Sequence, residues 1–208
     1  MPYTDVEGRL RTALTTLILD EYSLLETVRL PLPASERVIA HQIGWRLRTE
    51  YERSWDIDVE YNRVGHGSEG PGRGEPVDRP VDISVHHRGM TGPAHNLMVI
   101  ELKTNFAGDL AVELHRLGSI AKYYRYQHAC LLDLGITLGD EPNGPPVLVC
   151  PTWVWLPGGE QPGPVFPGDA ARQLSADGWE ARQRRYPVGA DRSDLLYEGW
   201  QAPVDPDD

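Results

Sequence analysis

The 208-residue sequence has the length of one ordinary domain, large enough to bury a hydrophobic core without disulfide staples. Hydrophobic residues make up 40% and charged residues 25% of the chain, and no apolar run approaches the roughly 20 residues of a membrane helix. The chain starts acidic and polar, unlike a signal peptide, so we expect a cytoplasmic protein that does not contact a membrane. The net charge of −11 disfavours nucleic-acid binding over the whole surface and leaves only a local basic patch for it.

Cysteine and lysine are both scarce. Cys130 and Cys150 lie 20 residues apart without a CxxC partner, which excludes a disulfide framework and a four-thiolate zinc site. The basic residues are 18 Arg and only two Lys, Lys103 and Lys122. Each of these lysines is therefore a candidate for a chemical role.

Apolar residues at helical spacing predict a helix over 4–29, interrupted near Asp20, with Thr4 and Glu7 as a capping box. Two prolines end this segment. Ser35 is then placed to cap a second helix that runs to about residue 52. The expected core face of that helix consists of Val38, Ile39, Ile43, Trp45 and Leu47.

The period changes to strand-like alternation at 56–62, at 81–85 and at 97–103, and the last two segments are predicted to form a hairpin. Residues 64–80 contain five Gly and three Pro without an apolar period. We expect this segment to be a loop inside one domain rather than a linker between two.

A helix over about 110–127 and a strand over 129–134 follow, which implies a βαβ crossover. Residues 147–156 predict a further strand towards a sheet edge, because Pro151 interrupts the run. A last helix is expected over 170–185.

Three residues of the predicted hairpin carry the chemical argument. Glu101 and Lys103 are two positions apart on one strand, so their side chains share a face while Ile100 and Leu102 point into the opposite layer. Asp82 lies on the preceding strand, at a cross-strand distance of roughly 5 Å in the usual geometry. Two carboxylates and an ammonium can therefore converge on one surface.

Two carboxylates suit a hard divalent cation such as Mg²⁺, for which Mn²⁺ substitutes. A neighbouring Lys can hold or help to deprotonate the attacking water, and it can stabilise negative charge that develops at phosphorus. An Arg at position 103 would be too basic to exchange its proton. The pattern predicts metal-dependent phosphodiester hydrolysis, with Asp82 and Glu101 as metal ligands and Lys103 as the activating group.

The order of these features resembles the PD-(D/E)XK nuclease superfamily: a capped helix starting with Glu36, then Asp82, then Glu101-Leu102-Lys103 at the end of an apolar strand. The resemblance covers about residues 35–135. It implies the restriction-endonuclease-like fold, an α/β fold with a mixed central sheet flanked by helices. In that family the Asp and Glu bind metal, the Lys is catalytic, the carbonyl after the Glu often adds a ligand, here that of Leu102, and the helix Glu often joins the site.

The sequence departs from the family pattern in two places. The residue before Asp82 is Val81, and the proline stands one position earlier, at Pro80. The later helix lacks the Gln-x-x-x-Tyr signature of the RecB-like branch. We expect one domain over 1–208, with its core over 35–135 and a C-terminal extension over 146–200.

Each candidate has a simpler reading. Glu101 and Lys103 can form an exposed salt pair of little energetic weight, and an acid such as Glu36 is favoured in any first helical turn. Asp78 is an alternative ligand to Asp82, and Glu60 is a second candidate for the auxiliary acid.

Lys122, Tyr124 and Gln127 follow the active strand on the predicted helix and can orient DNA or water, although a solvated helix face explains them as well. The function predicted first is a Mg²⁺-dependent DNA nuclease that acts alone, as a homodimer or in a larger complex. The alternatives are a catalytically inactive nuclease-fold protein that serves as a binding or assembly module, and an effector nuclease that acts on RNA.

Overall fold

The computed structural model describes residues 1–27, 35–51, 54–61, 81–157, 165–166 and 171–185. Its main sheet is built from β1 (Asp56–Tyr61), β2 (Val81–His86), β3 (Asn96–Lys103), β4 (His128–Asp133), β7 (Thr152–Pro157) and β8 (Val165–Phe166). These strands follow the order β1-β2-β3-β4-β7-β8. β3 and β4 are parallel and the other neighbouring pairs are antiparallel. The fold is therefore mixed α/β, as the sequence predicts.

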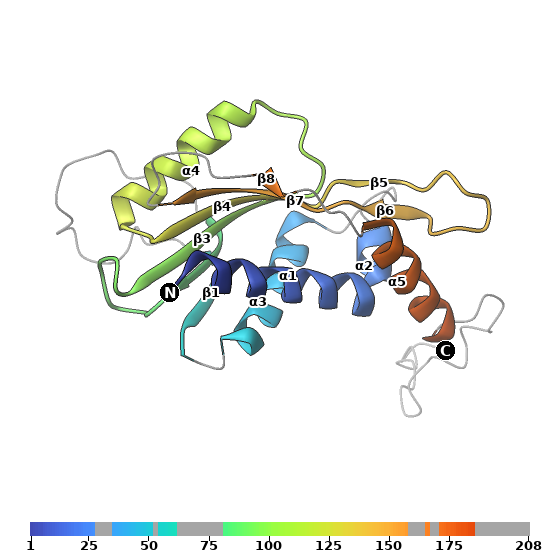
Figure 1. Cartoon of the computed structure of the whole chain (residues 1–208), viewed down its shortest axis with the longest axis horizontal. Coiled ribbons are helices and arrows are strands. Elements are labelled where there is room, and N and C mark those ends of the chain that lie inside the picture. The colour runs from blue at the N-terminus through green and yellow to red at the C-terminus, as the bar shows by residue number, and fades with distance from the viewer. Residues whose placement is uncertain (28–34, 52–53, 62–80, 158–164, 167–170, 186–208) are drawn as a thin grey trace, which may run out of the picture.

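Helices cover both faces of this sheet (Figure 1). They are α1 (Tyr3–Asp20), α2 (Tyr22–Thr27), α3 (Glu36–Glu50), α4 (Leu110–Tyr124) and α5 (Ala171–Arg185). α1 and α3 lie across one face, where they share the larger hydrophobic core with β2, β3, β4 and β7. α4 covers the other face over β3 and β4 and closes a smaller core. This helix is the crossover between the two parallel strands, so the predicted βαβ unit is confirmed.

The start of the chain differs from the prediction in one respect. The break near Asp20 is confirmed, because α1 ends there and α2 begins at Tyr22. The capping box is wrong: α1 begins at Tyr3, Pro2 is its N-cap and no side chain caps it. The Tyr3 ring packs edge-on against Trp155, with 5.5 Å between the ring centroids. Tyr3, which makes this tertiary contact, therefore already belongs to the helix, one residue before Thr4 of the predicted capping box.

α3 begins as predicted, since Ser35 Oγ accepts a hydrogen bond from the Val38 N–H at 3.4 Å. Its core face is narrower than expected: Val38 and Trp45 are 43% and 69% exposed. The buried face instead includes Gly44, where a Cβ would meet Val59 Cγ2 at 2.8 Å. The helix thus lies directly on β1, and this close approach fixes the position of its first turn.

The region 147–156 is not one strand. β6 (Val147–Val149) pairs with β5 (Ile136–Leu138) in a separate hairpin, and β7 then enters the main sheet between β4 and β8. Tyr22 of α2 binds this hairpin with its hydroxyl, which donates to the Val147 carbonyl at 2.7 Å and accepts from the Val147 N–H at 3.0 Å. The first and last parts of the described chain are joined at this point.

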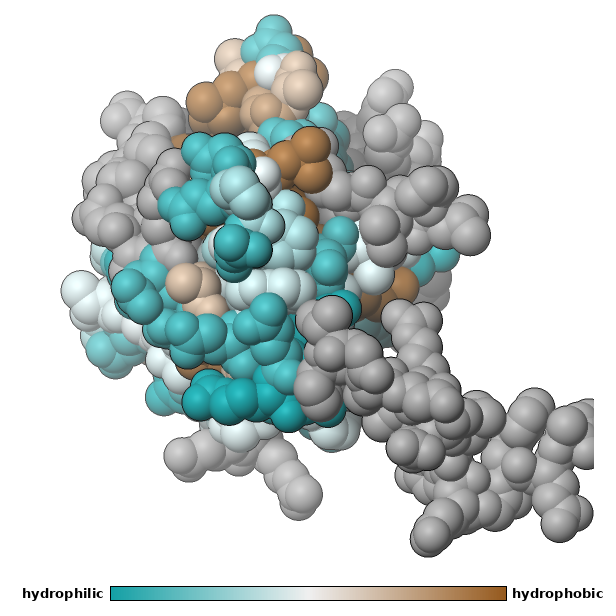
Figure 2. All heavy atoms as spheres, turned by 90° about the vertical axis from the view of Figure 1, so that its right-hand side faces the viewer, coloured by the Kyte–Doolittle hydropathy of each residue, from teal (hydrophilic) through white to brown (hydrophobic). Residues whose placement is uncertain are grey.

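None of the described helices is both long and apolar enough to span a bilayer. Figure 2 shows the end of the molecule opposite the N-terminus, where hydrophilic side chains predominate and apolar ones form small separate areas. One of the exposed apolar residues is Leu138 of the hairpin, at 69%. The predicted loop over 64–80 lies outside the described residues.

Candidate active site

The β2–β3 hairpin opens where Asp82 and Glu101 face each other. The paired register of the two strands ends with Ile83 opposite Ile100, so Asp82 and Glu101 are the next pair in the same register. At this position Asp82 Oδ2 accepts a hydrogen bond from the Leu102 N–H at 2.7 Å. A side-chain carboxylate thus replaces the next main-chain link of the ladder, and the two acids are brought to one face as predicted.

Glu101 and Lys103 share that face. Lys103 Nζ donates to Glu101 Oε1 at 2.9 Å, whereas Ile100 and Leu102 are fully buried in the opposite layer. Glu101 is only 5% exposed. The pair is therefore not the exposed salt bridge of the simpler reading.

Two residues of α4 that sequence reasoning missed complete the surroundings of Glu101. Arg116 forms an ion pair with Glu101 Oε1, and it also bonds Glu113 Oε2 through Nη2 at 3.1 Å and Nε at 3.3 Å. The second carboxylate oxygen of Glu101, Oε2, is buried and has no hydrogen-bond partner among the described residues. Buried polar atoms are normally satisfied, so such an atom calls for an explanation.

The Leu102 carbonyl is directed to the same side as the Asp82 carboxylate. In a strand the N–H and C=O of one residue point the same way, and the neighbouring residues point the other way. The Leu102 N–H points to β2, whereas the Lys103 carbonyl points towards β4 and accepts from the Leu134 N–H at 2.9 Å. The Leu102 carbonyl therefore points towards β2, the strand that carries Asp82, and it is the third ligand that the family resemblance expects.

Glu36, in the first turn of α3, reaches the end of β3. Its Oε1 accepts from the Thr104 N–H at 3.1 Å and from Thr104 Oγ1 at 3.4 Å. Its charge also acts on both Asp82 and Lys103. The structure thus brings the predicted auxiliary acid to the cluster, although its hydrogen bonds hold the backbone after β3.

The charges of the cluster are not balanced. Burial and, after it, the neighbouring Glu101 carboxylate raise the pKa of Asp82 to about 6. The hydrogen bond from the Leu102 N–H and the charge of Lys103 lower this pKa, but by less. Burial lowers the pKa of Lys103, but the hydrogen bond that Lys103 donates to Glu101 and the charges of the surrounding carboxylates outweigh it and leave the pKa raised. Four carboxylates surround two cations: Asp82, Glu101, Glu36 and Glu113 against Lys103 and Arg116.

This donor set fits Mg²⁺. Hard cations take oxygen ligands, and Mg²⁺ is usually held by one or two carboxylates while it keeps several waters. The buried Glu101 Oε2, the Asp82 carboxylate and the Leu102 carbonyl supply such oxygens, and the excess negative charge suits a divalent ion. The described residues contain no group of three or more His, Cys, Asp and Glu side chains arranged to hold a metal ion, so the set relies on the main-chain oxygen.

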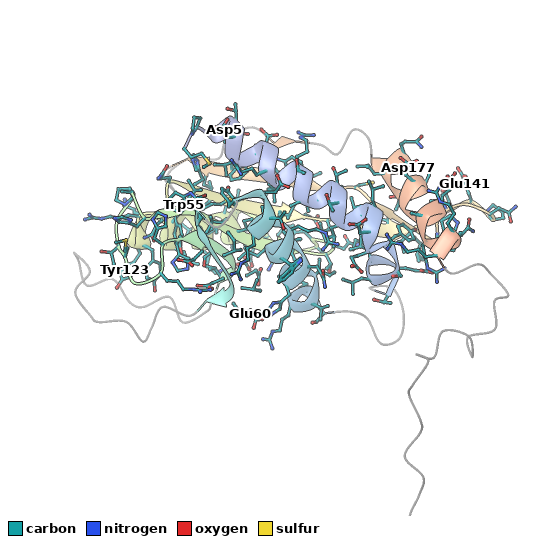
Figure 3. The ribbon with its side chains drawn as sticks, turned by 90° about the horizontal axis from the view of Figure 1, so that it is seen from below. Asp5, Trp55, Glu60, Tyr123, Glu141 and Asp177 are labelled. Atoms are coloured by element: carbon teal, nitrogen blue, oxygen red, sulfur yellow. The ribbon has the colours of Figure 1, made fainter. Side chains whose placement is uncertain are left out.

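Other predicted candidates lie elsewhere. Glu60 forms an ion pair with Arg37 and lies beside α3 (Figure 3). Tyr124 and Gln127 belong to the opposite end of β3, since the Tyr124 carbonyl and the Gln127 N–H bond Asn96. Glu101 is five positions further along the strand than Asn96, a distance of roughly 17 Å. Asp78, the alternative ligand, lies outside the described residues.

Comparisons with models of protein families, with curated proteins and with solved structures found no match.

Proposed function

We propose that this chain is a Mg²⁺-dependent nuclease that hydrolyses phosphodiester bonds in DNA. The observation that supports it most is the buried Glu101 Oε2, which has no hydrogen-bond partner in the described part of the chain and lies beside a second carboxylate of raised pKa. A divalent cation at this position satisfies that oxygen and relieves the repulsion between Asp82 and Glu101. The resemblance of the motif to the PD-(D/E)XK superfamily points to the same chemistry and the same fold.

In this proposal Asp82, Glu101 and the Leu102 carbonyl hold Mg²⁺, or Mn²⁺ in its place. When bound there, the cation would polarise the phosphodiester and favour the ionised form of a water. The Glu36 carboxylate acts as the auxiliary acid, because it fixes the backbone at Thr104, directly after Lys103.

Lys103 stabilises charge rather than accepting a proton. Its raised pKa keeps the side chain an ammonium at neutral pH, and an ammonium has only donors to offer. During hydrolysis a water oxygen bonds to phosphorus while the ester bond to the leaving sugar oxygen breaks. Lys103 donates to an oxygen that gains negative charge in this step, the proton of the attacking water passes to solvent, and the leaving sugar oxygen takes up a proton from solvent.

A second candidate function is supported by the net charge of −11 and by the two cations that already pair with Glu101. It is an inactive nuclease-fold module that binds or assembles with a partner. Binding of a divalent cation separates the two candidates, because a module without chemistry has no need for it.

The test is a calorimetric titration of Mn²⁺ into the wild type, Asp82→Ala and Glu60→Ala, together with cleavage assays. The substrates are supercoiled, linear and single-stranded DNA, and a single-stranded RNA. We expect wild type and Glu60→Ala to bind Mn²⁺ and to cut DNA. Loss of the Asp82 ligand removes several kcal/mol of transition-state stabilisation, so cleavage by Asp82→Ala should fall by at least about a thousandfold.

Glu60 is the matched control because it is also a carboxylate near the start of α3, yet it pairs with Arg37 outside the cluster. Cleavage of RNA in place of DNA would change the substrate and keep the chemistry. A wild type that neither binds Mn²⁺ nor cuts any substrate would contradict the nuclease function and favour the binding module.

A further inference from the structure

Arg116 occupies a particular place in the cluster. α4 carries it over the end of β3, and its side chain is 24% exposed, against 7% for the Glu101 side chain with which it pairs. Glu113 lies three residues earlier on the same helix, so it reaches Arg116 from the same face. The guanidinium therefore bridges a buried carboxylate on the sheet and a more exposed one on its own helix.

Arg116 contacts only one of the two oxygens of the Glu101 carboxylate. Arginine commonly grips a carboxylate with two parallel hydrogen bonds, one to each oxygen. Here Arg116 and Lys103 both bind Oε1, while Oε2 has no hydrogen-bond partner among the described residues. Arg116 also bonds Glu113 Oε2, through Nε and through the same Nη2 that pairs with Glu101.

The two cations at Glu101 differ in their freedom to leave. Lys103 stands on the same strand as Glu101, two positions away, and its side chain is 22% exposed. Arg116 already holds a second carboxylate, Glu113, with two hydrogen bonds. It can give up Glu101 without losing a charged partner. A divalent cation at Glu101 would repel a guanidinium on the same carboxylate, and Arg116 is the group with an alternative.

We propose that Arg116 is the resident counter-ion of this site: it pairs with Glu101 when no divalent cation is bound and moves onto Glu113 when one binds. The inference rests on the proposed function, because it presupposes a divalent cation at Asp82 and Glu101. Arg116 is thereby a positioning residue that keeps the Glu101 carboxylate folded inward and sets the affinity of the site.

The test compares metal binding by wild type, Arg116→Gln, Glu113→Gln and the double variant, with Lys122→Gln as control. Lys122 is an exposed cation on the same helix, so its variant loses the same charge away from the cluster. Mn²⁺ affinity is measured by calorimetry, and melting temperature is measured in chelator and in saturating Ca²⁺. Neither measurement depends on cleavage.

Arg116→Gln removes the competitor, so we expect its Mn²⁺ affinity to rise about tenfold, within the range of typical coupled sites. It should melt below wild type in chelator, and the gap should close in saturating Ca²⁺. Glu113→Gln takes away the alternative partner, so its Mn²⁺ affinity should fall. In the double variant the effect of Glu113→Gln should disappear, because no guanidinium remains to be displaced.

Unchanged or weaker binding by Arg116→Gln, with normal binding by wild type, would overturn this inference and leave the nuclease proposal intact. An undiminished effect of Glu113→Gln in the double variant would also overturn it, since Glu113 would then act only through its charge. If Arg116→Gln fails to fold, Arg116→Met, which keeps most of the length of the side chain and loses its charge, takes its place in the same single and double variants, and the same outcomes support or overturn the inference. Absence of Mn²⁺ binding and of cleavage in wild type would instead overturn the proposed function.

Discussion

Two carboxylates on the same face of neighbouring strands have pKa values that are shifted in opposite directions. Asp58 of β1 lies opposite Ser84, which is two residues from Asp82 on β2, so both acids share a face. Asp58 is hydrogen-bonded by His86 Nε2 at 2.8 Å and by Arg88 Nε at 2.9 Å. Burial alone would raise the pKa of Asp58, but these two partners outweigh it and leave the pKa lowered.

Asp82 has one main-chain N–H as its hydrogen-bond donor, and the adjacent Glu101 carboxylate helps burial to raise its pKa to about 6. The fold thus balances the charge of Asp58 with cationic partners, whereas it keeps Asp82 and Glu101, which carry like charges, close together. The first arrangement is typical of a structural ion pair. The second stores unfavourable energy at a defined place, as functional sites often do.

Removal of Asp58, the acid whose charge is balanced by its partners, should have the largest effect on stability. Asp58→Ala takes a charged partner from the fully buried His86 and from Arg88, so we expect the free energy of unfolding to fall by about 3 kcal/mol. Chemical denaturation with urea measures this change. Cleavage by the folded variant should stay close to wild type, and a loss of cleavage without a loss of stability would place Asp58 in the site.

Removal of the charge of Asp82 should instead increase the free energy of unfolding. Asp82→Asn keeps an oxygen that can accept the Leu102 N–H and removes the repulsion from Glu101. The pKa shift of about two units corresponds to about 3 kcal/mol, and solvent screens part of it, so we expect this variant, measured in chelator at pH 7.5, to be more stable than wild type by about 2 kcal/mol. The same denaturation experiment gives the comparison.

The raised pKa of Asp82 determines the direction in which stability changes with pH. The pKa of Asp82 is higher in the folded chain than in the unfolded one, so the folded chain binds more protons between about pH 4 and pH 6. Wild-type stability should fall through this window as pH rises, and the advantage of Asp82→Asn should vanish below it. An advantage that is equal at pH 3.5 and pH 7.5 would contradict the electrostatic explanation.

The same carboxyl should make metal binding sensitive to acid. A proton on Asp82 competes with the cation, and at a pKa of about 6 the ionised fraction falls about tenfold between pH 7 and pH 5. We expect Mn²⁺ affinity to fall by that factor, measured by calorimetry in matched buffers. An Asp of ordinary pKa would leave the affinity nearly constant over this range, so a flat profile would contradict the raised pKa.

Much of the sheet could be predicted because the decisive patterns are local. Alternation in β2 and β3 and the helical period of α4 are properties of short windows, and the hairpin and the crossover follow from them. The β5–β6 hairpin was missed because its strands have three residues each, too few for a period to show. The exposure of Trp45 depends on which face of α3 meets the sheet, and that is a tertiary property.

The candidate site was predictable only on its strands. A spacing of two residues suffices to place Glu101 and Lys103 together, and the hairpin brings Asp82 opposite them. Arg116 is one of 18 arginines, and its approach to Glu101 depends on how α4 lies over β3. A weak signal existed, since Glu113 and Arg116 form a complementary pair one turn apart on the helix that follows the active strand.

The hydrogen bonds between Tyr22 and Val147 have a consequence for the order of folding. They join residues 125 positions apart, and α1 also packs against α5 near the end of the described chain. Contacts so distant in sequence form slowly, because a long loop must close first. α1 can meet α3 early, because the two helices are close in sequence, but its contacts with α5 must wait for the later segments. Part of the apolar face of α1 therefore stays uncovered until those segments fold.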